Sequence, residues 1–168
     1  MSDQEFAASD FLNQVIRPAL TAIGQDSPAA EQLLLATALQ ESDLRTTVQM
    51  GGGPALGYFQ MEPATHDDIW ANFLRYRAEL ASGLRRLAGI AAGVPHAGLL
   101  ASNHRYAAAM TRVHYMRVPA PLPAAGDAAA MAAYWKDHYN TAGGAGSTAQ
   151  FLRKWANHRV AALVAELV

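Results

Sequence analysis

Glu41 is the residue of this sequence best placed for acid–base chemistry. In a helix, Leu34, Ala38 and Glu41 lie on one face, because they stand four and three residues apart. A carboxyl group at the end of an apolar face is partly desolvated, and the negative end of the helix dipole also disfavours a carboxylate, so both effects raise its pKa. Such a group holds a proton near neutral pH and can donate it in general acid catalysis. An exposed glutamate at a frayed helix end is the alternative that periodicity leaves open.

A second group of residues follows Glu41 after the glycines at 51, 52 and 53. The stretch 55–65 reads ALGYFQMEPAT. In order and spacing, the chain over about residues 33–65 resembles the lysozyme-like lytic transglycosylases of the soluble type. That family has a Glu-Ser pair closing a helix, a Gly-Ala-x-Gly-Leu-Met-Gln stretch, and Pro-x-Thr opening the next helix. The matching positions are Glu41, Ser42, Ala55, Gly57, Gln60, Pro63 and Thr65, while Tyr58 and Phe59 replace the two apolar residues before Gln60 and Pro54 stands where the family usually has glycine.

The resemblance implies a glycosidase that cleaves the glycan strand of peptidoglycan, with no cofactor. Glu41 would protonate the glycosidic oxygen between N-acetylmuramic acid and N-acetylglucosamine, and would then act as the base. In the transglycosylases the muramic 6-hydroxyl closes a 1,6-anhydro ring where a muramidase would use water. The substrate-binding residues would be Ser42, which would also help the turn after the helix, and Gly57, Tyr58, Gln60, Tyr115 and Tyr139. Gly57 is equally plausible as a turn residue.

Two further residue types could complete the site. The family's later Ala-Tyr-Asn-x-Gly motif, whose tyrosine bonds the catalytic glutamate, has two imperfect matches, at Tyr115 and at Tyr139. Tyr115 is the preferred partner of Glu41 and Tyr139 the alternative. A hydrolase usually needs a second carboxylate, and Glu62 is the candidate second acid. Without one in the cleft, transglycosylation assisted by the acetamido group of the substrate is the better interpretation.

The elements that would position these residues are all predicted to be helices. Apolar spacing, proline starts and glycine breaks predict helices over 6–23, 28–41, 63–74, 75–87, 97–117, 127–141 and 147–167. The segment 44–50 could pair briefly with the glycine turn as a small hairpin. We therefore predict an all-α fold, α+β at most with a tiny hairpin, as one lysozyme-like domain of about seven helices over residues 1–168. The tryptophans at 70, 135 and 155 are predicted to be core anchors.

Composition argues against several other classes of function. Thirteen Lys and Arg against 14 Asp and Glu give a net charge of -1, which disfavours binding to nucleic acid. The chain has no cysteine, and its six histidines show no metal-ligand spacing, so no metal site is predicted. The GAGSTA stretch at 144–149 fits a relaxed dinucleotide fingerprint, but no strand precedes it, so a loop with Ser147 capping the last helix is the better interpretation.

The N-terminal stretch contains no signal peptide, and no apolar run is long enough for a membrane span. We therefore expect a protein made in the cytoplasm that acts at the periplasmic cell wall or as part of a phage virion. The rival to an enzyme is a non-catalytic lysozyme-fold protein, a structural or wall-binding component of a phage particle or secretion machine. The near-neutral charge favours the rival, and the pairing of Glu41 with Gln60 favours the enzyme.

Overall fold

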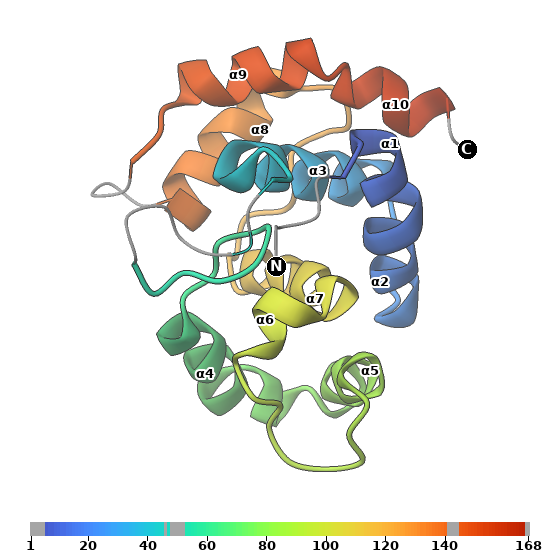
Figure 1. Cartoon of the computed structure of the whole chain (residues 1–168), viewed down its shortest axis with the longest axis vertical. Helices are drawn as coiled ribbons and strands as arrows, with labels where there is room; N and C mark the ends of the chain where they lie inside the picture. The colour runs from blue at the N-terminus through green and yellow to red at the C-terminus, as the bar shows by residue number, and fades with distance from the viewer. Residues whose placement is uncertain (1–5, 46, 48–52, 141–144, 167–168) are drawn as a thin grey trace.

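The structure is a computed structural model that describes residues 6–45, 47, 53–140 and 145–166. It is 67% helical and 1% strand, so the predicted all-α class is confirmed. The elements in chain order are α1 (Ala8–Phe11), the π-helix η1 (Leu12–Ile16), α2 (Arg17–Ala22), α3 (Pro28–Ser42), α4 (Pro63–Asn72), the 3-10 helix η2 (Leu74–Tyr76), α5 (Ala78–Ala88), α6 (Leu99–Ser102), α7 (His104–Met116), α8 (Ala128–Trp135), the π-helix η3 (Lys136–Asn140), α9 (Thr148–Asn157) and α10 (Val160–Glu166) (Figure 1).

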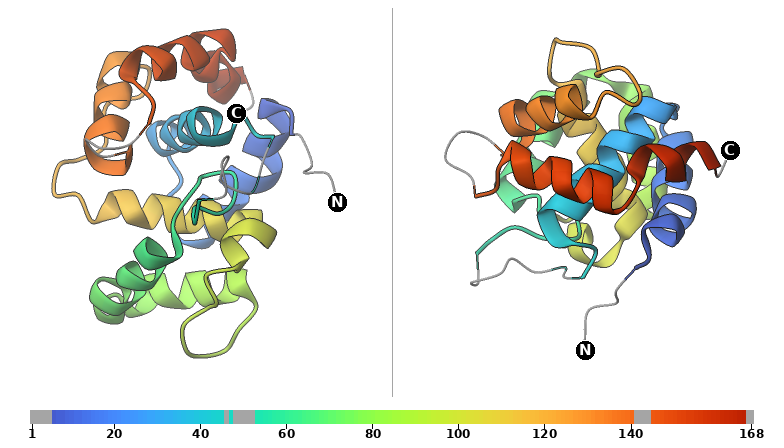
Figure 2. Two further views of the ribbon diagram at one scale, coloured as in Figure 1. Left: turned by 60° about the vertical axis from the view of Figure 1, so that its left-hand side comes forward. Right: turned by 90° about the horizontal axis from the view of Figure 1, so that it is seen from above.

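Helix α3 is the central element of the fold. Ser27 caps its start by accepting a hydrogen bond from the Ala30 backbone at 3.1 Å, and Pro28 occupies the first turn, as predicted. Every residue from Ala30 to Leu39 is buried, so no face of the helix is left to solvent. Helices α8, α9 and α10 lie on one side of it and α7 lies on the other (Figures 1 and 2). A side chain at the C-terminal end of α3 therefore emerges among packed elements.

The first predicted helix is interrupted by a π-helical turn ahead of Pro18. Proline has no backbone N–H, and its ring crowds the carbonyl four residues earlier, which here belongs to Gln14. The chain widens to a π-helix over Leu12–Ile16 and then resumes as α2. The Gln14 carbonyl accepts a hydrogen bond from Arg105 Nε at 2.8 Å. The irregularity caused by Pro18 thus also joins the first helical segment to α7.

A buried hydrogen-bond network holds α4 against α7. Trp70 Nε1 donates to the Tyr106 hydroxyl at 2.9 Å, so that hydroxyl donates to His66 Nε2 at 2.7 Å. The other ring nitrogen of His66 then carries the hydrogen that Asp67 accepts at 2.9 Å. His66 and Tyr106 are both fully buried, and burial lowers the pKa of His66. The network is closed to solvent at Tyr106, so we interpret it as structural.

Several predicted boundaries differ from those in the structure. The helix predicted over 97–117 is two helices, because the Asn103 side chain accepts from the Tyr106 backbone at 3.0 Å and caps a new start. The helix predicted over 147–167 also breaks, at His158 and Arg159, and Arg159 has a φ of 52°. The helix predicted over 75–87 begins only at Ala78, after the 3-10 turn η2. The helix predicted over 127–141 finishes as the π-helix η3.

The predicted hairpin over 44–50 lies largely outside the described residues. The described chain has an antiparallel bridge at a later position, between Leu56 and Met61, where the two backbones exchange hydrogen bonds of 2.9 and 3.1 Å. Within the described residues, no helix is both long and apolar enough to cross a membrane. Trp70, Trp135 and Trp155 are all buried, which confirms their prediction as core residues.

Candidate functional site

Glu41 lies in the last turn of α3, where its carboxyl group is partly buried. Its Oε2 accepts a hydrogen bond from Trp135 Nε1 at 3.1 Å. Burial raises the pKa of Glu41 from 4.5 to about 7, although the Trp135 bond and the charges of Lys154 and Lys136 oppose the rise. Desolvation is the largest of these effects, so the carboxyl group is about half protonated at neutral pH. The expectation of a desolvated carboxyl group at this position agrees with the structure.

Lys154, on α9, also reaches the end of α3. Its ammonium group donates to the carbonyls of Leu39 and Gln40 at 3.3 and 3.2 Å. It also pairs with the Asp43 carboxylate at 3.1 Å. The last carbonyls of a helix lack intrahelical partners and carry partial negative charge, so a cation is favoured here. Lys154 therefore completes the C-terminus of α3 and sets part of the electrostatic potential at Glu41.

Trp135, on α8, is held rigidly where it meets Glu41. Its ring is fully buried and stacks on Phe151, with the ring centroids 5.4 Å apart. The Lys136 ammonium lies 6.0 Å from the Trp135 ring centroid and donates to the Asn140 side chain at 2.7 Å and to the Gly146 carbonyl at 3.0 Å. The indole N–H therefore has a fixed direction, and Glu41 accepts it without a large loss of side-chain entropy.

Both candidate tyrosines lie near Glu41, but their hydroxyls bond to other groups. Thr37 donates to the Leu33 carbonyl, so it accepts from the Tyr115 hydroxyl at 2.9 Å. The Tyr139 hydroxyl donates to the Phe59 carbonyl at 2.5 Å. The two rings stack with centroids 5.3 Å apart, and burial, together with the Glu41 charge, raises the pKa of each phenol. The two tyrosines are therefore close enough for the Glu41 charge to act on them, but the described hydrogen-bond donor to Glu41 is Trp135.

Ser42 and Tyr58 are enclosed by the fold, which contradicts their predicted contact with substrate. The Ser42 hydroxyl donates to the Tyr58 carbonyl at 2.7 Å, lies 3.0 Å from the Ala38 carbonyl and accepts from the Leu44 backbone at 3.2 Å. The only hydrogen of this buried hydroxyl is therefore used within the fold, so it cannot be donated to a ligand. The Tyr58 ring is also buried, against the rings of Phe6, Phe11 and His104. The role of Ser42 in the turn after the helix agrees with the structure.

Gly57 and Gln60 form the tight turn that follows. Gly57 has a φ of 78°, and a Cβ atom there would lie 2.0 Å from the Leu100 carbonyl oxygen. The backbone at this glycine therefore lies directly against α6. Gln60 has a φ of 51°, and its side-chain nitrogen donates to the Gly57 carbonyl at 2.9 Å. Ser42 and Tyr139 bond to successive carbonyls of this turn, which ties it to the two elements flanking Glu41.

The acids close to Glu41 in sequence lie in other surroundings. Glu62 is exposed at the start of α4. Asp43 pairs with Lys154, and Asp68 pairs with Arg117 at 2.8 Å. The charges that act on the pKa of Glu41 are those of the two lysines. A second carboxylate is therefore not part of the described site, and the described residues contain no group of three or more potential ligands that could hold a metal ion.

Comparison of the chain with family models, with curated proteins and with solved structures finds no match. The resemblance to lytic transglycosylases therefore stays a prediction that rests on the residues of this sequence.

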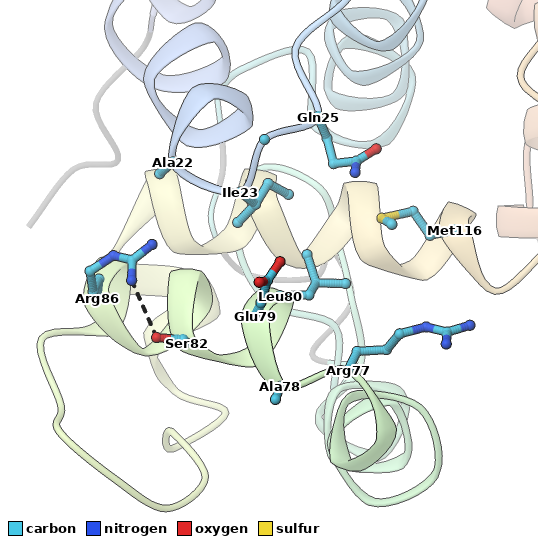
Figure 3. A pocket seen from close by; sticks show the side chains of 11 residues that line it. Ala22, Ile23, Gln25, Arg77, Ala78, Glu79, Leu80, Ser82, Arg86 and Met116 are labelled. Atoms are coloured by element: carbon cyan, nitrogen blue, oxygen red, sulfur yellow. Dashed lines mark hydrogen bonds between the residues drawn. The ribbon is translucent and has the colours of Figure 1, made fainter.

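Three cavities lined by described residues have linings that do not include Glu41. One of about 730 Å³ is bounded by the end of α2, the first turns of α5 and the end of α7 (Figure 3). It combines an apolar lining, from Ile23, Leu80 and Met116, with the charged side chains of Arg77 and Glu79. None of the predicted site residues lines it. Two smaller cavities, of about 480 and 210 Å³, lie beside Phe6 and Leu44 and beside Arg112 and Tyr134.

The most important contacts of Glu41 were missed by sequence reasoning. Trp135 was predicted only as a core residue, and Lys154 was not singled out. Both lie about one hundred residues from Glu41 in sequence, and nothing in local spacing pairs them with it. One weak signal was available. Lys154 comes one residue before Trp155 and shares a face of α9 with Phe151, so it must lie near the helix against which that face packs.

Proposed function

We propose that this protein is a glycosidase that cleaves the β-1,4 bond between N-acetylmuramic acid and N-acetylglucosamine in peptidoglycan, with Glu41 as its general acid and base. The observation that carries the proposal is the pKa of about 7 at a partly buried carboxyl group that a fixed indole N–H orients. Such a group holds a proton at neutral pH and can also give it up, which acid–base catalysis requires. The substrate class rests on the resemblance around residues 33–65.

Within this proposal, transglycosylation is favoured over hydrolysis. Glu41 donates its proton to the glycosidic oxygen as the bond from that oxygen to C1 breaks. The resulting carboxylate takes the proton from the 6-hydroxyl of the muramic residue, and that oxygen attacks C1 to close the 1,6-anhydro ring. One carboxyl group suffices for both steps. A two-carboxylate hydrolase would need a second acid at the site, whereas Glu62 is exposed at the start of α4.

A non-catalytic wall-binding or structural component of a phage particle or secretion machine is the second candidate. One observation favours it: the net charge of -1.

Digestion of purified peptidoglycan, with the products identified by mass spectrometry, separates these functions. We expect products with 1,6-anhydro ends. Products with reducing ends would show a muramidase, and no released product would favour the non-catalytic candidate. Glu41→Gln should abolish release, because an amide cannot donate the required proton, while the exposed Glu62→Gln should retain it. An active Glu41→Gln variant would refute the assignment of the acid.

A further inference from the structure

Arg112, on α7, is a cation without a partner. Among the described residues it forms no hydrogen bond or ion pair, and its Nε atom is buried with no acceptor within reach. A guanidinium group stays charged in proteins and carries five N–H donors, so it cannot relieve this cost by losing its proton. Leaving such a group partly buried and unpaired is strongly unfavourable. The buried Nε therefore needs an external acceptor, either water or a bound ligand.

The cavity beside Arg112 has room for that acceptor. It measures about 210 Å³, the volume of about seven water molecules in the liquid. The end of α7, the proline-rich loop after it and Tyr134 on α8 form its walls, and its lining residues are Arg112, Tyr115, Met116, Val118, Pro119, Ala120, Pro121, Leu122 and Tyr134. Apart from Arg112, side chains without formal charge make up this lining. The cavity therefore offers one cationic group among mostly apolar and aromatic surfaces.

The walls of this cavity are held in place without a ligand. The Tyr134 hydroxyl donates to the Ala120 carbonyl at 3.1 Å and fixes the loop over α8. Farther along the loop, the Gly126 backbone donates to the buried Gln32 side chain of α3 at 2.7 Å. Tyr115 and Tyr134 pack with ring centroids 5.5 Å apart. A preformed cavity of this kind loses little entropy when a ligand enters it.

We propose that the cavity between α7 and the loop 118–122 binds a small carboxylate that has an apolar body. The carboxylate accepts from the Arg112 guanidinium, and the apolar body contacts the prolines and the tyrosine rings. The size of the cavity limits the ligand to a few heavy atoms or to the end of a longer chain. This inference concerns a different site from Glu41 and does not depend on the proposed glycosidase activity.

The test uses two small ligands of equal shape, isobutyrate and isobutyramide, titrated into the full chain at neutral pH. We expect isobutyrate to shift the backbone amide NMR signals of residues 112–118, 120, 122 and 134 with saturation. Isobutyramide should bind at least tenfold more weakly, because it lacks the charge that Arg112 requires. Inorganic phosphate, an anion without an apolar body, should also bind at least tenfold more weakly. Equal binding of isobutyramide, tight binding of phosphate alone, or no saturable shift with isobutyrate would each overturn the proposal.

Two variants identify the residue responsible. Arg112→Met keeps the length and packing of the side chain and removes the charge, so isobutyrate affinity should fall at least tenfold. The unliganded variant should unfold at the same temperature as the wild type or at a higher one, because the unpaired cation is gone. Arg153→Met, on the exposed face of α9, is the matched control and should leave isobutyrate affinity unchanged. Unaltered affinity in a folded Arg112→Met variant would refute the role of Arg112, and if that variant does not fold, the comparison of ligands in the wild type still decides.

Discussion

At the scale of single residues, Glu41 shows how opposing electrostatic effects are resolved. Burial raises its pKa, while one indole N–H and two lysines lower it, and the result is a pKa of about 7. The rise from 4.5 to about 7 corresponds to about 3 kcal/mol at high pH, because each pKa unit is worth about 1.4 kcal/mol. The fold therefore maintains an unfavourable group at this position. Strongly perturbed acids of this kind concentrate at functional sites.

The pH dependence of the proposed reaction follows directly from this pKa. The first step requires the protonated form of Glu41, so kcat/KM should fall as the pH rises through about 7, approaching tenfold per pH unit above it. Initial rates on solubilised peptidoglycan between pH 5 and 9 provide the measurement, over a range of about four units. A rate that stays constant up to pH 9 would exclude Glu41 as the acid.

The same pKa predicts that Glu41→Gln stabilises the protein at alkaline pH. A group whose pKa is raised by folding contributes stability below its unfolded value of 4.5, and that contribution is lost as the pH rises through about 7. At pH 8, roughly one unit above the folded value, Glu41→Gln should therefore raise the free energy of unfolding by up to about 3 kcal/mol. At pH 4.5 the gain should vanish.

Urea denaturation at the two pH values measures this difference. The exposed Glu62→Gln variant is the control, and we expect no comparable pH-dependent gain from it. A Glu41→Gln variant that is less stable than the wild type at pH 8 would show that the carboxylate is stabilised, and would contradict the raised pKa.

At the scale of elements, the site depends on a turn that packs unusually closely against a helix. Gly57 combines a φ of 78° with a backbone approach to Leu100 that leaves no space for a Cβ atom. Gly89 has almost the same φ, 77°, but nothing lies within 4 Å of its Cβ position. Alanine substitutions at Gly57 and Gly89 should therefore share the free-energy cost of the backbone conformation, and only the substitution at Gly57 should add the cost of a steric clash.

Gly57→Ala should be much more destabilising than Gly89→Ala. The left-handed conformation alone costs an alanine about 1–2 kcal/mol, and this cost applies to both variants. The clash at position 57 should add at least about 2 kcal/mol, because the turn must move away from α6. Equilibrium urea denaturation of the two variants tests this. Equal losses of stability would show that the approach of Gly57 to Leu100 is looser than the structure has it.

Most elements of the fold could be predicted from the sequence, because helical spacing, Ser27 and the proline starts are local signals. The breaks at Asn103 and Arg159 were missed, because a single residue that ends or starts a helix hardly changes the helical spacing of the apolar residues around it.

The acid of the candidate site was also predictable from its place on an apolar helix. Its partners were not, because Trp135 and Lys154 reach it through tertiary packing. Ser42 and Tyr58 were wrongly assigned to substrate for the same reason: spacing does not reveal which side chains the core encloses.

At the scale of the whole molecule, buried histidines determine the response to acid. The pKa values of His66, His104 and His114 are all lowered by burial, that of His114 to about 4. The unfolded chain therefore binds more protons than the folded chain below the ordinary histidine value of 6.5. The stability contributed by these groups is complete above that value and is lost as the pH falls toward 4. Glu41 and Glu31, whose pKa values are raised by burial, act in the opposite direction over much of this range, but the histidines with lowered pKa values outnumber them.

We predict that the free energy of unfolding decreases as the pH falls from 6.5 to 4, and that His114→Gln removes about 3 kcal/mol of this decrease. Chemical denaturation at a series of pH values measures the slope. The exposed His158→Gln variant controls for the loss of a histidine as such. A His114→Gln variant that keeps the full wild-type slope would show that His114 does not remain neutral in the folded protein.

The distance in sequence between Glu41 and its neighbours also matters during synthesis. Trp135, which donates a hydrogen bond to this acid, and Lys154, whose charge acts on its pKa, come from α8 and α9, which leave the ribosome after α3. A growing polypeptide that stops before residue 128 lacks both side chains, and with them the hydrogen bond that orients the carboxyl group. The surroundings of this acid are therefore complete only when about the last quarter of the chain, from residue 128 onward, has docked.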